Sequence, residues 1–226
     1  MGGGGLIVKT QLQQIKPADI ETRSFEIIAQ ELAAMGQALP PDQAPVIMRA
    51  IHASADFDYA DNLYFSPGAL EAGLQALKEG ACIVTDTNMA FSGVSKPALA
   101  KLQGRALCFM AEEDVAEQAR RRGVTRAAVC MEKAAALEGP LIVAVGNAPT
   151  ALIRLCELME EGRVAPRLVI GAPVGFVNVM ESKEMLMRSK APCIVARGRK
   201  GGSNIAAALC NALLYLAAGR GEQATK

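Results

Sequence analysis

His52 is the side chain in this sequence best suited to moving protons near neutral pH, because imidazole ordinarily titrates there. It is the one histidine among 226 residues. Arg49 lies three residues earlier, and two helical residues at that spacing are neighbours on one face. A fixed cation beside an imidazole suits an anionic ligand that must gain or lose a proton. The alternative interpretation is a histidine that only caps carbonyl groups at a helix end.

The residues around this pair predict the helix that positions them. Asp42 can cap its start and Pro45 falls in its first turn. Ile47, Ala50 and Ile51 then recur at helical spacing, which is typical of a buried stripe. The arginine and the histidine are expected to lie away from that stripe.

Composition narrows the classes of protein. The 24 basic and 23 acidic residues give a net charge of +1, so no overall field favours nucleic acid or a membrane surface. Tryptophan is absent and aromatic residues are sparse, which argues against stacking platforms for single-stranded nucleic acid. The length suits one substantial α/β domain.

Six scattered cysteines indicate buried, reduced thiols, because most lie in apolar runs and none forms a Cys-x-x-Cys pair. They are Cys82, Cys108, Cys130, Cys156, Cys193 and Cys210. With one histidine and no cysteine pair, we expect no metal site built from protein ligands.

The chain ends are expected to lie outside the folded domain. We expect a flexible arm over residues 1–14, a single domain over 15–218 and a polar tail over 219–226. No stretch approaches the roughly 18 consecutive apolar residues of a membrane span, and the start lacks the features of a signal peptide. We therefore expect a cytoplasmic protein.

From residue 80 onward, short apolar runs alternate with helical segments, which predicts a parallel sheet of five strands with helices on both faces. The expected strands are 81–85, 106–110, 141–145, 168–170 and 192–196. The expected helices are 112–122, 125–137, 148–161, 177–189 and 203–217, with Thr125 as the cap of the second.

The residues before 80 differ, and we interpret them as a helical arm of the same domain. A first helix starts near Asp19, with Phe25, Ile28, Leu32 and Met35 on one stripe. The His52 helix follows, then an irregular aromatic stretch through residue 65 and a helix over 67–78.

Loops that follow the strands are the candidate ligand sites, because ligands of open parallel sheets bind beyond the carboxyl ends of the strands. The loops are 85–89, 146–150, 171–176 and 197–203. Several lead into helix starts, whose free N–H groups attract carboxylate or phosphate, and the last adds Arg197, Arg199 and Lys200. The alternative is that their Gly and Pro residues simply turn the chain. None matches a nucleotide motif, which argues against NAD, ATP and S-adenosylmethionine.

Six segments together resemble one family, the precorrin-8 methylmutases of cobalamin biosynthesis. The segments are 21–25 (ETRSF), 49–53 (RAIHA), 146–152 (GNAPTAL), 173–177 (PVGFV), 181–183 (ESK) and 197–203 (RGRKGGS). The resemblance covers about residues 15–218. It implies a flavodoxin-like three-layer α/β/α fold, a homodimer with active sites near the subunit interface, and an isomerisation that needs no cofactor.

The resemblance also implies the reaction and three site residues. A methyl group moves from C-11 to C-12 of a corrin ring, giving cobyrinate or its metal-free counterpart, hydrogenobyrinate. His52 takes the role of proton donor and acceptor, and Ser24 and Arg49 contact the substrate. Neighbouring pathway enzymes are possible further partners.

Loop position and chemistry extend the predicted substrate-binding set. It adds Arg23, Asn147, Thr150, Arg199 and Ser203. The corrinoid is a large ring fringed with carboxylates, which spread-out amide and guanidinium donors suit. Protonating a ring nitrogen withdraws electrons and lowers the barrier to methyl migration, so one general acid can suffice.

Two alternatives and one question of substrate remain open at this point. A carrier that binds the corrinoid product without converting it needs the same loops but not His52. A nucleotide-binding regulator is a more distant alternative. Segment 55–59 resembles the cobalt-containing branch, and Asp56 and Asp58 would favour a protonated His52 unless they are solvated caps of the next turn.

Overall fold

A six-stranded sheet forms the centre of the structure, a computed structural model that describes residues 15–219. The predicted flexible arm over 1–14 lies outside these residues, as does the predicted polar tail except its first residue. The strands are β1 Leu63–Phe65, β2 Cys82–Thr85, β3 Arg105–Leu107, β4 Leu141–Val145, β5 Leu168–Gly171 and β6 Cys193–Ala196. They lie in the order β1-β6-β5-β4-β2-β3.

Strands β2 to β6 are the five parallel strands that the apolar runs predicted. Every residue of β2, β4, β5 and β6 is buried, which explains why these runs are continuously apolar. β3 closes one edge of the sheet and exposes Arg105.

The prediction of a five-stranded, wholly parallel sheet was wrong at the other edge. β1 pairs antiparallel with β6, with Leu63 opposite Ala196 and Phe65 opposite Ile194. This strand lies in the stretch interpreted as irregular. Three residues are too few to show an alternating pattern, and only the partner β6 makes them a strand.

Helices account for most of the remaining described residues, and most predicted helices are confirmed. They are the 3-10 turn Pro17–Asp19, α1 Ile20–Ala34, α2 Ala44–Ser54, α3 Tyr59–Asn62, α4 Ala69–Lys78, α5 Asn88–Gly93, α6 Lys96–Lys101, α7 Glu113–Arg122, α8 Arg126–Ala135, α9 Pro149–Glu160, α10 Val179–Arg188 and α11 Ser203–Ala217. No helix within residues 15–219 has the length and apolar character that crossing a bilayer requires.

Three details of the helices differ from expectation. The N-cap of α2 is Gln43, not Asp42, and no side chain caps that helix. The short helices α3, α5 and α6 were not predicted, and α3 lies in the stretch interpreted as irregular. On α1, Ile28 and Leu32 are buried as expected, whereas Met35 is exposed because it lies beyond the end of the helix. The predicted cap Thr125 is confirmed, since its hydroxyl accepts from the Ala128 N–H at 3.2 Å.

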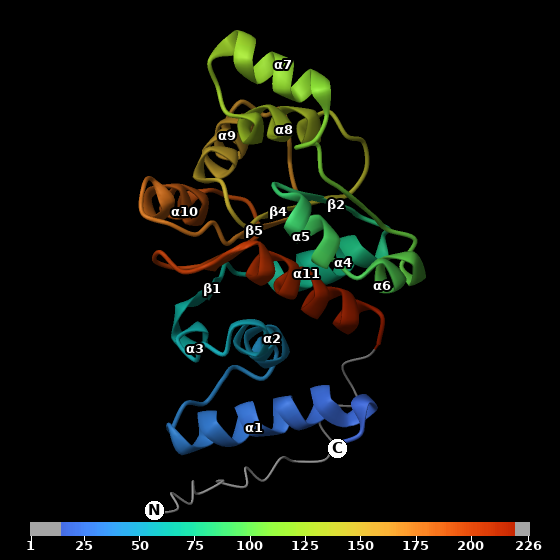
Figure 1. Ribbon diagram of the computed structural model, residues 1–226, viewed down its shortest axis with the longest axis vertical. Coiled ribbons are helices and arrows are strands. Elements are labelled where there is room, and N and C mark those ends of the chain that lie inside the picture. Colours follow the sequence, from blue (N-terminus) through green and yellow to red (C-terminus); the bar gives the residue numbers. More distant parts are fainter. Residues whose placement is uncertain (1–14, 220–226) are drawn as a thin grey trace, which may run out of the picture.

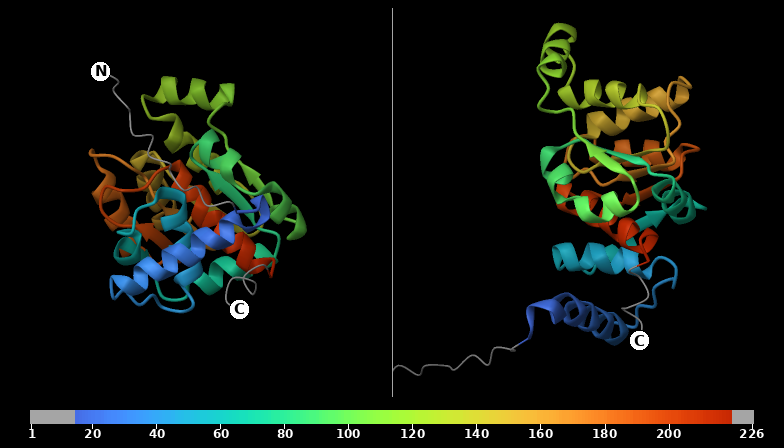
Figure 2. Two further views of the ribbon diagram at one scale, coloured as in Figure 1. Left: turned by 60° about the horizontal axis from the view of Figure 1, so that its bottom comes forward. Right: turned by 90° about the vertical axis from the view of Figure 1, so that its right-hand side faces the viewer.

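Helices cover both faces of the sheet and continue beyond it on one side. The core on one face involves α7 to α10, and the core on the other involves α4, α5, α6 and α11. α2 packs on α11, and α1 packs on α2 farther from the sheet (Figure 1). Figure 2 shows α1 as the outermost layer on this side. The predicted helical arm is therefore a stack of α1 and α2 on α11.

Candidate functional site

His52 lies in the last turn of α2, where its side chain is exposed. The helix ends at Ala55, which adopts the left-handed conformation with φ 54°. The imidazole stacks on the ring of Phe25 from α1, with the ring centroids 5.3 Å apart and the planes 19° from parallel. The only histidine is therefore held in one orientation while it stays open to a ligand.

Arg49 shares the same aromatic ring. Its guanidinium lies 4.7 Å from the centroid of Phe25 and 5.0 Å from that of Tyr215 on α11. One of its nitrogens is 3.0 Å from a carboxylate oxygen of Glu21, and only 16% of the side chain is exposed. The predicted grouping of Arg49 and His52 on one face is confirmed, because both contact Phe25.

The predicted residues on α1 lie beside this ring in the chain. The Ser24 hydroxyl donates to the carbonyl of Ile20 at 2.9 Å, which is an intrahelical bond to the preceding turn. Arg23 pairs with Glu26 on the same helix at 2.9 Å. Both side chains therefore have partners within α1, and a ligand would compete with those partners.

The end of α2 meets the start of α11 and the loop before it. The Asn204 side-chain amide donates to the carbonyl of Ala53 at 3.5 Å. Lys200 reaches across to Asp56 at 2.7 Å and also to Asp58. These contacts bring the predicted loop 197–203 next to the segment that carries His52.

The pairing with Lys200 changes the interpretation of the two aspartates. Both carboxylates contact that ammonium, whose hydrogen bond holds the pKa of Asp56 below its ordinary value. Asp56 also accepts the N–H of Asp58 at 3.1 Å, as a local turn residue does. The partner of both aspartates is therefore Lys200.

Ser203, at the start of α11, joins this loop to two strand ends. Its hydroxyl lies 2.7 Å from that of Thr87, which follows β2. A Cβ at Gly146, which follows β4, would come within 2.7 Å of the Ser203 Cα. Glycine is therefore required there by the close approach of the α11 start. The loops after β2, β4 and β6 converge, as predicted.

A buried carboxylate, Asp86, organises the loop after β4. It accepts the N–H groups of Gly146 at 2.7 Å, Asn147 at 2.9 Å and Ala148 at 2.7 Å. Burial raises its pKa, although these three bonds act in the opposite direction. The amides expected to attract a ligand carboxylate are thus already occupied. The exposed side chain of Asn147 is what this loop presents.

Asp86 was missed as a site residue, although the sequence holds a signal for it. An aspartate directly after a buried strand is placed at the carboxyl edge of the sheet. Thr150 differs from the other predicted residues. Its hydroxyl lies 2.8 Å from that of Thr125 at the start of α8, on the sheet face opposite to α11.

Arg199 lies beside an exposed apolar loop. Its guanidinium is 5.4 Å from the ring centroid of Phe176, which is 83% exposed. The neighbouring Val174, Val177 and Met180 are exposed as well. A cation and an uncovered aromatic ring therefore meet at the carboxyl ends of the strands.

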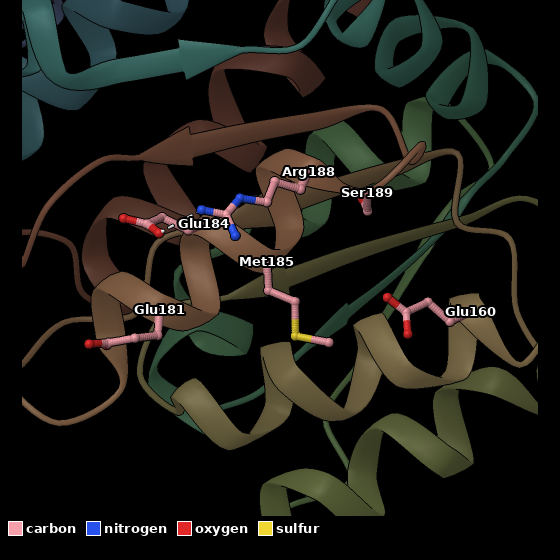
Figure 3. Close-up of a pocket in the computed structure, with 6 residues that line it drawn as sticks. All are labelled: Glu160, Glu181, Glu184, Met185, Arg188 and Ser189. Atoms are coloured by element: carbon pink, nitrogen blue, oxygen red, sulfur yellow. Dashed lines mark hydrogen bonds and ion pairs between the residues drawn. The ribbon is translucent and has the colours of Figure 1, made fainter.

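A separate cavity of about 350 Å³ lies between α9 and α10 (Figure 3). Its lining residues are Glu160, Glu181, Glu184, Met185, Arg188 and Ser189. None of these is a predicted site residue, and three carboxylates do not suit a substrate that is itself rich in carboxylates. Within residues 15–219, no group of three or more His, Cys, Asp or Glu side chains could hold a metal ion.

Comparisons with known proteins agree on one family. The family model described as precorrin-8X methylmutase matches residues 19–216. The cobalt-precorrin-8 methylmutase of Priestia megaterium is 41% identical, with 90% of this chain and 89% of that protein covered. The precorrin-8X methylmutase of Pseudomonas aeruginosa is 43% identical, with 86% and 93% covered.

A solved structure is similar over nearly the same length. It is the precorrin-8x methyl mutase from Thermus thermophilus, 41% identical in sequence with a TM-score of 0.81. The match covers 90% of this chain and 99% of that one.

Proposed function

This chain belongs to the precorrin-8X methylmutase family, and we propose that it transfers a methyl group from C-11 to C-12 within the ring of precorrin-8 or cobalt-precorrin-8. The chain is accordingly an isomerase of cobalamin biosynthesis. The products are hydrogenobyrinate and cobyrinate.

His52 is the proposed general acid and base. The observation that carries this role is the exposed imidazole stacked on Phe25, beside the cation of Arg49. Proton transfer from His52 to a ring nitrogen makes the conjugated ring more electron-poor, which favours migration of the methyl group to the adjacent carbon. The proton returns to His52 when the product forms, so the reaction consumes no co-reactant.

The surrounding donors are proposed to bind the carboxylates of the ring. Arg49 shares the ring of Phe25 with His52, and Ser24 directly precedes Phe25 on α1, whereas Arg199, Ser203 and Asn147 belong to the converging loops. Arg23 and Thr150 belong to the same proposed set. Arg23 already pairs with Glu26, and the hydroxyl of Thr150 contacts that of Thr125. The exposed side chain of Phe176 supplies an apolar surface for the ring itself.

We also propose the type of fold, the bounds of the domain, the cellular location and the oligomeric state. In chain order, the five parallel strands have the spatial sequence 2-1-3-4-5, which supports a flavodoxin-like fold. The sheet and both its cores lie within one proposed domain, residues 15–218. Six cysteines without disulfides support a cytoplasmic location. The exposed side chains of Ile20, at the start of α1, and Met35, directly after its end, support a homodimer.

The cobalt-containing ring is the substrate we favour, on the resemblance of segment 55–59. Relatives do not separate the two branches. The cobalt-precorrin-8 methylmutase of Salmonella typhimurium is 43% identical to this chain, as is the precorrin-8X methylmutase from Pseudomonas aeruginosa.

Replacing His52 by alanine tests the function and its rival together. We expect His52→Ala to lower turnover by about 10²- to 10⁴-fold, the usual contribution of a general acid. Binding of hydrogenobyrinate should stay close to that of the wild type, because the carboxylate donors remain. Turnover is followed by absorbance with metal-free and cobalt-loaded substrate in turn, without oxygen.

The outcomes separate three explanations. Full turnover by the variant removes the general-acid role. Tight product binding by a wild-type protein that converts neither substrate favours the non-catalytic carrier. Faster conversion of the metal-free ring overturns the branch assignment and leaves the methyl shift intact.

A further inference from the structure

Lys183 is a lysine in the interior of the protein, on α10, with 1% of its surface exposed. Its ammonium donates to the carbonyl oxygens of Gly198 and Lys200, each at 2.8 Å. Within the described residues no carboxylate forms an ion pair with it. Burial lowers its pKa to about 8. An apolar side chain of similar length would avoid the cost of burying this cation, so packing alone does not explain it.

The two carbonyl groups belong to the loop that carries Arg199. The intervening carbonyl, that of Arg199, accepts the N–H of Gly175 at 3.2 Å. Three successive carbonyl oxygens are therefore held by hydrogen bonds within the protein. No N–H group of residues 198–201 donates to another described residue, which leaves these groups for a ligand.

The rest of the loop is fixed as tightly. A Cβ at Gly201, where φ is 157°, would lie 2.3 Å from the carbonyl oxygen of Ala172, so only glycine fits. The N–H of Gly202 donates to that same oxygen at 2.8 Å. Lys200 then connects the loop to Asp56, four residues beyond His52.

We propose that Lys183 is a positioning residue for substrate binding, which holds the carbonyl groups of residues 198 and 200 inward. The loop thereby presents the guanidinium of Arg199 and the unpaired amides of residues 198–201 to one carboxylate of the ring. This inference rests on the proposed function, because the ligand is the carboxylate-fringed substrate or product. Lys183 itself contacts the loop and not the ligand.

Lys183→Met is the test, because methionine keeps most of the length and removes the donor. Hydrogenobyrinate binding, measured by absorbance titration, should weaken by about tenfold or more, since bonds to a charged group are lost with the loop geometry. The kcat at saturating substrate should change less than KM, because His52 is untouched. The exposed Lys190→Met is the matched control and should bind like the wild type.

A double-mutant cycle separates positioning from general loss of structure. If Lys183 acts through Arg199, adding Arg199→Met to Lys183→Met should weaken binding by less than about twofold more. Lys183→Gln replaces Lys183→Met in the cycle if the methionine variant does not fold, since glutamine keeps an N–H donor.

Each result has one meaning. Unchanged affinity in Lys183→Met, or effects of the two substitutions that simply add, overturns the positioning role. A wild-type protein that does not bind hydrogenobyrinate overturns the proposed function before Lys183 is tested.

Discussion

At the scale of single residues, one aromatic ring holds both the proposed acid and the proposed carboxylate-binding cation. Phe25 stacks on His52 and lies against Arg49, so a change in one contact reaches the other. Glu21 competes with any ligand for the guanidinium of Arg49. The carboxylate of Glu21 therefore occupies the position beside Arg49 where we expect one carboxylate of the substrate.

This competition predicts opposite effects for the two partners. Arg49→Ala should weaken hydrogenobyrinate binding by about 1.5–3 kcal/mol, the range for a hydrogen bond to a charged group. Glu21→Gln should bind at least as tightly as the wild type, because it removes the competitor and keeps the side-chain length. Calorimetric titration measures both. Equal affinity of Arg49→Ala and wild type would show that the arginine serves the fold alone.

Asp86 gives a second prediction, this time for stability. In Asp86→Asn one acceptor oxygen becomes an NH₂ group, which faces a backbone N–H and leaves it unpaired. We expect the free energy of unfolding in urea to fall by about 1–3 kcal/mol. The matched control is Asp114→Asn, whose ion pair with Lys133 is exposed to solvent and should contribute much less to stability. Equal losses in both variants would contradict the structural role of Asp86.

At the scale of elements, the sequence predicts what depends on local patterns. The five parallel strands are recognisable because each is continuously apolar and bounded by polar loops. β1 is not, because a three-residue edge strand depends on its pairing with β6. The short helices α5 and α6 similarly have too few turns to show a periodic stripe.

The same reasoning explains which parts of the site were predictable. His52 and Arg49 are three residues apart in one helix, so their grouping follows from local geometry. The partners of Asp86 lie about 60 residues away, and those of Lys183 about 15. No periodic pattern marks such contacts, which only the folded sheet brings together. For that reason the amides after β4 were wrongly expected to be free.

At the scale of the whole molecule, uncovered apolar side chains indicate a partner surface. Ile20, at the start of α1, and Met35, directly after its end, are 52% and 56% exposed. Phe176 and Val177 form a second exposed group at the strand ends. A monomer seldom leaves such groups without a function, and the proposed homodimer would cover at least one of them.

Light scattering at micromolar concentration should therefore give twice the chain mass of 23.7 kDa. Ile20→Glu and Phe176→Glu identify the surface involved, because a buried unpaired charge weakens an interface. If only one of the two variants becomes monomeric, the substituted residue lies in the dimer interface. The other variant then serves as the control. A monomeric wild-type protein would contradict the homodimer.

The outer position of α1 has a kinetic consequence. This helix rests mainly on α2, yet it supplies the ring that orients His52. Segments with few neighbours open at a lower free-energy cost than the core, and their amides exchange with solvent sooner. Detachment of α1 would remove the ring that orients the proton donor while every strand stays paired. The rate at which this one helix leaves and returns then sets how long the imidazole keeps the orientation that Phe25 gives it.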